Sequence, residues 1–478
     1  RVGGVAGFNQ GLFGPVLIYG LAEAISRGIT FVIFPVLTHL FTSADFGRIS
    51  LLTSLGAFAG LAANCGLNNA VHRYYLDSQA TDKSRKAVVS TGFSLLLVLS
   101  TGVAVVSTVL LFLAGDKLLD RVAVYPAFVA LITIVPSQLL QYSQDVMRLH
   151  STPWRYLLLA VAKSTFGLVF GIVLVVYLEL GIWGYFVGLF CGQLVLIPWG
   201  LLLIRNDLSL KTDRKVASQM LTYGYPFIFA GLGQWVISSA DLFILSQLRG
   251  ISEVGIYSVG LRVTAIVMLA TTAFSQAWAP AALRLHAENP DYRKIVGEML
   301  PRIGGVLLYV AAGVSFFGKE LLTWLTPPEY HAAALPLCFL SMSAAVSGTV
   351  QVTVLGLAFE RRSDLIAKAI WGCAIVGVGV SFFMTWQFGL LGTAAANLIT
   401  ALMLTASYLF LTQSIHPLAI DYMAVRKMLF LGAIVLASAI FFGMFQATLP
   451  IFLSKVVAML LVLFWGNRLG FSLPRFGK

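Results

Sequence analysis

The chain has 478 residues, of which 58% are hydrophobic and 11% are charged, and its mean hydropathy is +0.88. A soluble domain carries about 25% charged residues, so this composition excludes an ordinary soluble protein. Residues 369–420 contain no Asp, Glu, Lys or Arg, which is enough for two spans of ~20 residues each. The composition predicts an all-α polytopic membrane protein.

The formal net charge of +12 does not indicate a nucleic-acid partner. The Lys and Arg residues gather in alternate loops, as cytoplasmic loops of membrane proteins do, so we expect both termini in the cytoplasm. Cys65, Cys191, Cys338 and Cys373 lie in apolar runs without metal-ligand spacing. We therefore interpret them as small packing residues and expect no metal site. The first apolar run is not expected to be a cleavable signal peptide.

The apolar runs, taken in chain order, predict about fourteen transmembrane helices. The predicted spans are 15–40, 48–71, 87–114, 122–147, 155–178, 182–204, 219–248, 254–281, 300–325, 332–359, 366–386, 389–411, 426–446 and 448–466. No large soluble domain fits between them. The longest cytoplasmic segments are expected to be loops with at most short interfacial helices: 72–86, 205–218 and 282–299. The longest outer loops are expected to be short: 115–121 and 318–331.

A weak internal repeat relates the two halves of the chain. Phe46-Gly47 matches Val254-Gly255, and residues 181–184 match 389–392, each pair 208 positions apart. The repeat unit holds six spans, so both copies insert the same way up and are related by a pseudo-two-fold axis along the membrane normal. We predict two six-helix bundles and an extra helix pair. The predicted domains are 1–211, 212–415 and, for the pair with a cytoplasmic tail, 416–478. The pair is expected to pack at the periphery.

One motif lies where the second half begins. Asp241 stands near the outer end of an apolar run, a short polar turn follows, and then come Val254-Gly255, Tyr257-Ser258 and the basic residue Arg262. This pattern resembles polysaccharide exporters of the Wzx (O-antigen flippase) type, within the multidrug/oligosaccharidyl-lipid/polysaccharide (MOP) exporter superfamily. With the repeat, the resemblance covers nearly the whole chain and implies a MATE-like architecture. It also implies a polyprenyl-diphosphate-linked oligosaccharide as substrate, with its diphosphate held by basic cavity residues.

Charged residues inside predicted spans are functional candidates, because a buried charge is costly in a bilayer without a partner or a wet cavity. Arg27, Lys163 and Arg262 are the predicted substrate-binding cations, and Arg262 belongs to the family-like motif. Glu23 and Asp241 are predicted ion-coupling groups or charge partners. Arg suits a diphosphate because its planar guanidinium binds oxygens in pairs.

Each of these residues has a structural alternative. Glu23 and Arg27 are four residues apart, in the favourable order for an intrahelical ion pair. Asp241 and Arg262 could form a bridge between neighbouring helices, which the substrate diphosphate would then replace. Lys163 could extend its stem toward the cytoplasm, and Lys455, close to a helix end, is expected to do so toward the outer surface.

Prolines and one further ion pair are predicted gate or hinge elements. Pro35, Pro136 and Pro226 interrupt spans 1, 4 and 7, where a proline removes a helical hydrogen bond. They could serve rocking between inward-open and outward-open states, or they could be passive kinks. Asp145 and Arg148 lie at the cytoplasmic end of span 4 and are interpreted as interfacial, with a possible role as a gate contact.

The favoured function is a flippase for a lipid-linked oligosaccharide in the bacterial inner membrane, working by alternating access for O-antigen or other surface polysaccharide assembly. The chain has no Walker A, HExxH or GxSxG motif, so we expect neither an enzyme nor ATP hydrolysis within it, and no cofactor. Coupling to an H⁺ or Na⁺ gradient is possible. Expected partners are the substrate, membrane lipid, and polysaccharide polymerase and chain-length proteins.

Two other functions are also compatible with the sequence. A cation-coupled MATE-like exporter of small molecules would use the same fold, and it predicts a carboxylate-rich ion site. A membrane-embedded glycan polymerase or ligase predicts a large outer loop with catalytic residues, and the short outer loops place it last. Fold alone does not separate these functions.

Overall fold

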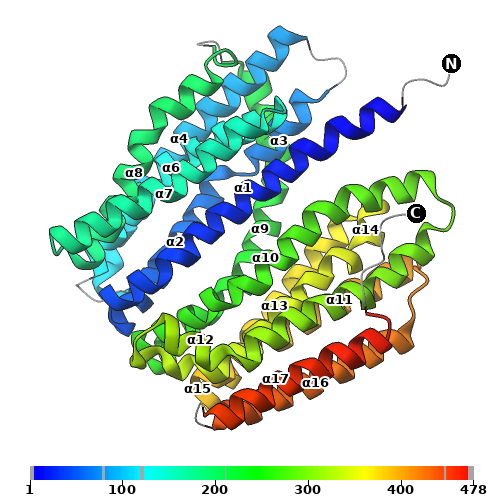
Figure 1. Ribbon diagram of the computed structural model, residues 1–478. Helices are drawn as coiled ribbons and strands as arrows, with labels where there is room; N and C mark the ends of the chain where they lie inside the picture. Colours follow the sequence, from blue (N-terminus) through cyan, green and yellow to red (C-terminus); the bar gives the residue numbers. More distant parts are fainter. Residues whose placement is uncertain (1–4, 78–80, 119–122, 210–211, 446–447, 472–478) are drawn as a thin grey trace. The chain divides into compact units, whose positions relative to one another are not determined.

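The computed structural model describes residues 5–77, 81–118, 123–209, 212–445 and 448–471, and among these it describes the side chains except those of 5–17 and 114–118. Secondary structure in the described part is helical throughout (Figure 1). In a bilayer an isolated helix satisfies its own backbone hydrogen bonds, which is why apolar runs of this length become helices. The helices of the first half are α1 (Val5–Leu40), α2 (Ser43–Asn64), α3 (Leu67–Tyr75), α4 (Asp82–Leu118), α5 (Val124–Ile132), α6 (Ile134–Leu149), α7 (Pro153–Tyr177) and α8 (Gly181–Ile204).

The second half continues in the same way. Its elements are α9 (Arg214–Arg249), α10 (Ile251–Glu288), α11 (Tyr292–Phe316), α12 (Gly318–Leu325), the 3₁₀ helix η2 (Pro328–Ala333), α13 (Ala334–Thr353), α14 (Leu355–Phe359), α15 (Ser363–Ile415), α16 (Tyr422–Met444) and α17 (Leu449–Arg468). Thirteen described segments are long and apolar enough to cross a membrane. α15 holds two predicted spans that meet at Gly389, where the backbone leaves the helical region. The prediction of an all-α protein with about fourteen spans is confirmed, and the chain is a multi-pass membrane protein.

Several predicted boundaries differ from the structure. The segment 282–299, expected to be a loop, is mostly the end of α10 and the start of α11. The outer segment 318–331 contains α12 and most of η2, while 115–121 lies partly outside the described residues. Charged residues such as Arg, Lys and Glu propagate a helix well, so a helix continues past the apolar run that identifies it.

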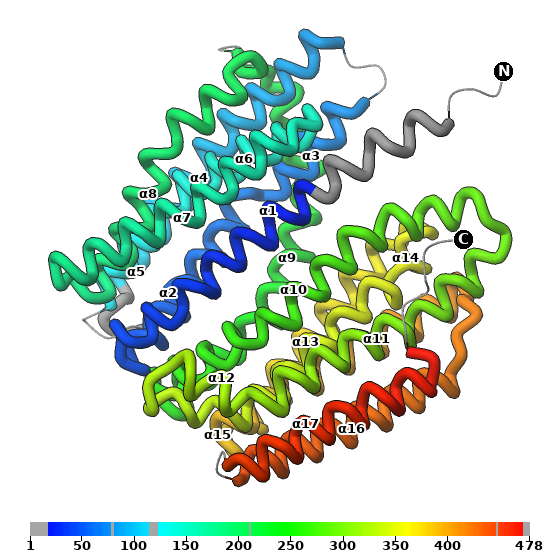
Figure 2. The backbone as a smooth tube through the Cα atoms, in the orientation of Figure 1, coloured from blue at the N-terminus to red at the C-terminus, as the bar shows by residue number. Residues whose placement is uncertain are grey.

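The chain divides into two compact units. Unit 1 comprises residues 1–41 and 48–235, and unit 2 comprises 42–47 and 236–478. The predicted domain boundaries at 211 and 415 stay a prediction. Within unit 1, a core cluster that includes Val71, Leu140, Tyr142 and Leu159 joins α3, α6 and α7. Within unit 2, α11 and α13 are mostly buried, and the smooth backbone tube shows α16 and α17 beside α11 (Figure 2).

Two glycines that the repeat pairs share an unusual backbone φ. Gly181 and Gly389 both have positive φ, at 53° and 59°. In this left-handed region a Cβ is costly, so glycine is the residue of choice. Arg249 Nη2 donates to the carbonyl oxygen of Trp386 at 2.8 Å, beside Gly389. The guanidinium thus satisfies a carbonyl left free where the helix of α15 breaks.

The other repeat-related pair of glycines lies at a helix contact within unit 2. A Cβ on Gly47 would overlap the carbonyl oxygen of Ile251, and a Cβ on Gly255 would overlap that of Ser43. Small residues allow two membrane helices to approach this closely. The start of α2 is therefore held against α10, and Ser43 Oγ hydrogen-bonds Ser252 Oγ at 2.6 Å beside the contact.

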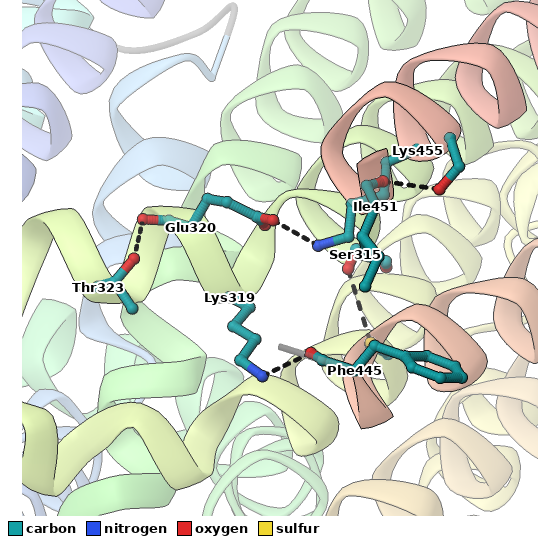
Figure 3. Close-up of polar contacts among 9 residues, drawn as sticks. Ser315, Lys319, Glu320, Thr323, Phe445, Ile451 and Lys455 are labelled. Carbon is teal, nitrogen blue, oxygen red and sulfur yellow. Dashed lines mark hydrogen bonds and ion pairs between the residues drawn. The ribbon is translucent and has the colours of Figure 1, made fainter. Parts of the chain in front are cut away.

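The C-terminal helix pair is attached to the rest of unit 2 through an ion pair. Lys455 Nζ on α17 lies 2.6 Å from Glu320 Oε1 on α12 (Figure 3). Only 1% of the Lys455 side chain is exposed, so the expectation that it extends to the outer surface is wrong. The nearby half-buried Lys319 donates to the carbonyl oxygen of Phe445 at 2.7 Å. A buried ammonium needs an acceptor, and Glu320 provides one.

This ion pair gives a stability prediction. Replacing Lys455 alone by Met leaves the Glu320 carboxylate, which is 24% exposed, without its partner, and we expect the free energy of unfolding to fall by up to about 3 kcal/mol. Lys455→Met combined with Glu320→Met should recover most of the loss, because no buried charge remains unpaired. Lys319→Met is the matched control and should change stability little. Thermal unfolding midpoints of the purified variants in detergent measure the effect, and equal midpoints for Lys455→Met and Lys319→Met would contradict it.

Candidate functional site

A buried hydrogen-bond network in unit 2 is centred on Asp241 of α9. Asp241 Oδ2 accepts from Tyr257 Oη at 2.5 Å and from Asn397 Nδ2 at 3.2 Å. Ser343 Oγ in turn donates to Asn397 Oδ1 at 2.6 Å. Asp241 is 6% exposed and Tyr257 is 0% exposed. The network therefore joins α9, α10, α13 and α15 in a region from which water is largely excluded.

A small cavity lies next to this carboxylate. It measures about 20 Å³, and its lining includes Ala240, Asp241, Ser381 and Asn397. That volume holds about one water molecule, and a bare monovalent cation is no larger. Ser381 Oγ is buried and has no hydrogen-bond partner among the described residues. One carboxylate with neutral oxygens around a cavity of this size is a donor set that suits H⁺ or a hard monovalent cation such as Na⁺.

Arg262 is the second feature of the site. It lies eleven residues into α10, roughly 16 Å along the helix, and is half-buried. Its guanidinium carbon lies 4.6 Å from the centroid of the Phe46 ring, a cation–π contact within unit 2. In the described part of the chain, Arg262 makes neither an ion pair nor a hydrogen bond. Its donors are therefore free for an anion.

The predicted bridge between Asp241 and Arg262 is wrong for this structure. The carboxylate instead accepts hydrogen bonds from Tyr257, from Asn397 and from the backbone N–H of Leu242, at 2.9 Å for the last. Sequence reasoning assigned a role to neither Tyr257 nor Asn397. Tyr257 belongs to the motif, so its pairing with the motif aspartate had a signal in the sequence. Asn397 lies 156 residues from Asp241, and only its place as a strongly polar side chain in an uncharged span marks it.

Glu23 and Arg27 form the predicted intrahelical pair on α1. Arg27 Nε donates to Glu23 Oε1 at 3.0 Å. The two side chains are 38% and 40% exposed. Arg27 is thus partly neutralised before any ligand arrives. Its role in substrate binding stays a prediction, and Arg262 is the stronger candidate because no carboxylate competes for it.

The other charged candidates lie in unit 1. Lys163 Nζ on α7 donates sideways to the carbonyl oxygen of Ser137 on α6 at 3.4 Å, which does not fit extension toward the cytoplasm. Arg148 lies 3.6 Å from Asp145 and also donates to the hydroxyl of Tyr156. Asp145 is buried and Arg148 is more exposed. The structure tests neither the gate role of this pair nor substrate binding by Lys163.

The three prolines differ in their surroundings. The helix of span 4 breaks at Thr133, between α5 and α6, three residues before Pro136. This is where the missing N–H and the ring of a proline disturb the preceding turn. α1 and α9 continue past Pro35 and Pro226 without a break in the helix assignment. A hinge role for these positions stays a prediction.

The chain is similar in sequence to proteins of polysaccharide biosynthesis. The sequence profile of a family described as polysaccharide biosynthesis protein matches residues 36–335. The chain is 24% identical over 217 residues to the "Probable low-salt glycan biosynthesis flippase Agl15" of Haloferax volcanii. That match spans 44% of this chain and 45% of the relative, so it covers about half the length of either protein.

Solved structures share the fold. The lipid II flippase MurJ, in an inward closed conformation, has a TM-score of 0.72 at 12% identity, over 94% of this chain and 98% of that one. A multidrug resistance MATE family transporter of the MOP superfamily, inward-facing, has a TM-score of 0.64 at 14% identity, over 82% and 98%. The predicted MATE-like fold is confirmed. At these identities the likeness shows the fold alone.

Proposed function

Because the chain belongs to the polysaccharide biosynthesis protein family, we propose that it is a flippase for a polyprenyl-diphosphate-linked oligosaccharide. The family match covers more than half of the chain. The fold is one that MurJ, described as a lipid II flippase, also has. Agl15 is described as a probable glycan biosynthesis flippase. Each of these supports translocation of a lipid-linked glycan from the cytoplasmic to the outer leaflet.

The main support for the proposal is the environment of Arg262. This residue is half-buried in a membrane-spanning helix, and it makes no carboxylate contact among the described residues. A cation in this setting requires an anion or water. The guanidinium fork matches the oxygens of a diphosphate, which it binds bidentately. Arg27 and Lys163 are proposed to assist, with Arg27 released from Glu23 when the substrate enters.

The Asp241 network is proposed as the coupling site. Its small cavity, its buried carboxylate and the unpartnered hydroxyl of Ser381 suit H⁺ or Na⁺. The ion would bias the equilibrium between inward-open and outward-open states only if it binds one state more tightly than the other. Pro35, Pro136 and Pro226 are proposed to accommodate that movement, and Asp145 with Arg148 to act as a gate contact.

The remaining assignments follow from the flippase proposal. The protein would lie in the bacterial cytoplasmic membrane with both termini in the cytoplasm, as the distribution of Lys and Arg in the loops favours. Its product would serve O-antigen or other surface polysaccharide assembly. Polysaccharide polymerase and chain-length proteins are the proposed partners, because they use the translocated glycan on the outer side.

A cation-coupled exporter of small molecules is the second candidate function. The Asp241 cavity favours it, since the same ion site would drive export, and the MATE transporter structure shares the fold. Arg262 argues against a cationic drug as cargo, because an unpaired guanidinium repels it.

A deletion strain tests the proposal. Loss of the gene should leave the completed lipid-linked oligosaccharide accumulating in the cytoplasmic leaflet, detected by mass spectrometry of extracted lipids and by its inaccessibility to a lectin added to spheroplasts. Complementation should restore lectin access. An unchanged lipid-linked pool together with increased sensitivity to cationic drugs would instead favour the exporter.

A further inference from the structure

A second and larger cavity lies within unit 1, and the described residues that line it carry no charge. Its volume is about 590 Å³, and it lies among α2, α5, α6, α8 and the start of α3. Ligand pockets for small molecules measure roughly 300–1,000 Å³. The described lining contains hydroxyls and amides but no charged side chain. The polar lining residues are Thr53, Asn64, Asn68, Thr133, Ser137, Gln138 and Gln141.

Four of these side chains are amides, and we call the space they line the amide cavity. Gln138 Nε2 donates to the carbonyl oxygen of Gly60 at 3.1 Å, and Asn64 Nδ2 donates to Gln138 Oε1 at 3.3 Å. A Cβ on Gly60 would lie 3.1 Å from Gln138 Nε2, so glycine makes room for this amide. These contacts hold Asn64 and Gln138 in fixed orientations across two helices.

The amides keep unused hydrogen-bonding groups. Asn68 Oδ1 is buried and has no partner among the described residues. Asn64 Oδ1 and Gln141 Oε1 also make no hydrogen bond in the described part of the chain, and Gln141 reaches only Asp145, at 3.5 Å. An unsatisfied amide inside a membrane protein costs free energy. Several amides with free oxygens in one cavity indicate a polar, uncharged ligand.

The chemistry of the lining narrows the ligand class. Amides and hydroxyls both donate and accept, as sugar hydroxyls do, so the two sets pair without a net charge. A metal ion or an organic cation would need carboxylates, and the described lining offers none. Lys163 is not among the lining residues, and its ammonium donates to the carbonyl oxygen of the lining residue Ser137. Phe186 and Leu189 add apolar surface for the faces of a sugar ring.

We propose that the amide cavity is a carbohydrate subsite that binds neutral sugar residues of the lipid-linked glycan. This inference rests on the proposed flippase function. It adds the position that the glycan would occupy within unit 1. The sugar would hydrogen-bond Asn68 and Gln141 through their free oxygens, and Asn64 and Gln138 would position one another for it. Recognition by neutral amides selects for hydroxyl-rich sugars without requiring one particular sugar sequence.

Binding of two lipids to the purified full chain in detergent tests the subsite. The probes are undecaprenyl diphosphate and undecaprenyl diphosphate N-acetylglucosamine, with Kd measured by native mass spectrometry. The wild type should bind the sugar-bearing lipid at least about tenfold more tightly than the sugar-free lipid, as two hydrogen bonds would give. Asn68→Leu should abolish this ratio and leave the Kd of undecaprenyl diphosphate unchanged.

Two further variants keep the test informative. Gln141→Met removes another amide at constant length and should also lower the ratio, even if Asn68→Leu folds poorly. Gln219→Met, an exposed amide on α9 outside the cavity, is the control and should behave as the wild type. A wild type that binds both lipids equally would refute the subsite and leave the flippase proposal standing. A wild type that binds neither lipid would contradict both.

Discussion

Arg262→Ala is expected to abolish translocation of the lipid-linked glycan while the protein still folds and reaches the membrane. The guanidinium packs on Phe46 and makes no described ion pair, so its loss leaves no buried carboxylate unpaired. The substrate diphosphate would lose two charge-assisted hydrogen bonds, which corresponds to at least about 100-fold weaker binding. Arg262→Lys should retain part of the activity, because a point charge replaces the planar fork.

The controls for this prediction follow from the structure. Arg362→Ala removes an exposed arginine paired with Asp364 at 2.9 Å and should leave translocation near the wild-type rate. The double variant Asp241→Ala with Arg262→Ala should be as inactive as the single variants, because the two residues form no ion pair. Recovery of activity in the double variant would show instead that the two charges balance each other in a state that this structure does not represent.

Asp241→Asn is expected to uncouple translocation from the ion gradient. The asparagine keeps the shape of the side chain and an oxygen that accepts from Tyr257, but it removes the charge that would hold H⁺ or Na⁺. In proteoliposomes the wild-type rate should change about tenfold when a Na⁺ or H⁺ gradient is imposed, a usual size for coupling between sites. The rate of the variant should be low and should not respond to either gradient.

Tyr257→Phe distinguishes the effect of the Asp241 charge from the effect of the hydrogen bond that Tyr257 donates to it. This variant loses one hydrogen bond to Asp241 and keeps the carboxylate, so its rate should fall less and should still depend on the gradient. A gradient response of Asp241→Asn equal to that of the wild type would rule out Asp241 as the coupling group. In that case the network would only stabilise the packing of α9, α10, α13 and α15.

Much of the fold was predictable because a long apolar segment in a bilayer has few backbone conformations other than a helix available to it. The apolar runs located the spans, and Gly181 and Gly389, which the repeat had paired, both adopt positive φ. What the apolar pattern did not reveal is where a helix ends outside the membrane, as at 282–299, and where it breaks inside, as at Thr133. The positions of helix ends and breaks depend on which groups hydrogen-bond the free backbone N–H and C=O groups there, and hydropathy does not report this.

The site was less predictable because the rotation of each helix about its axis is set by packing. Tyr257 and Arg262 both lie on α10, but only Tyr257 hydrogen-bonds Asp241. Lys455 meets Glu320, 135 residues away in the sequence. A search for charges inside spans also overlooks neutral groups such as Asn64 and Gln138. Their polarity within apolar helices was the available signal, since amides in membrane helices usually have a partner.

Translocation by the purified protein in proteoliposomes tests directly whether the chain is a flippase that depends on Arg262. Liposomes contain undecaprenyl diphosphate N-acetylglucosamine with a labelled sugar in both leaflets, and the fraction accessible to an external membrane-impermeant galactosyltransferase is followed over time. We expect the wild type to make all of the labelled lipid accessible and Arg262→Ala to leave accessibility at about half, as in protein-free liposomes. Equal accessibility with the wild type and with protein-free liposomes would contradict this expectation.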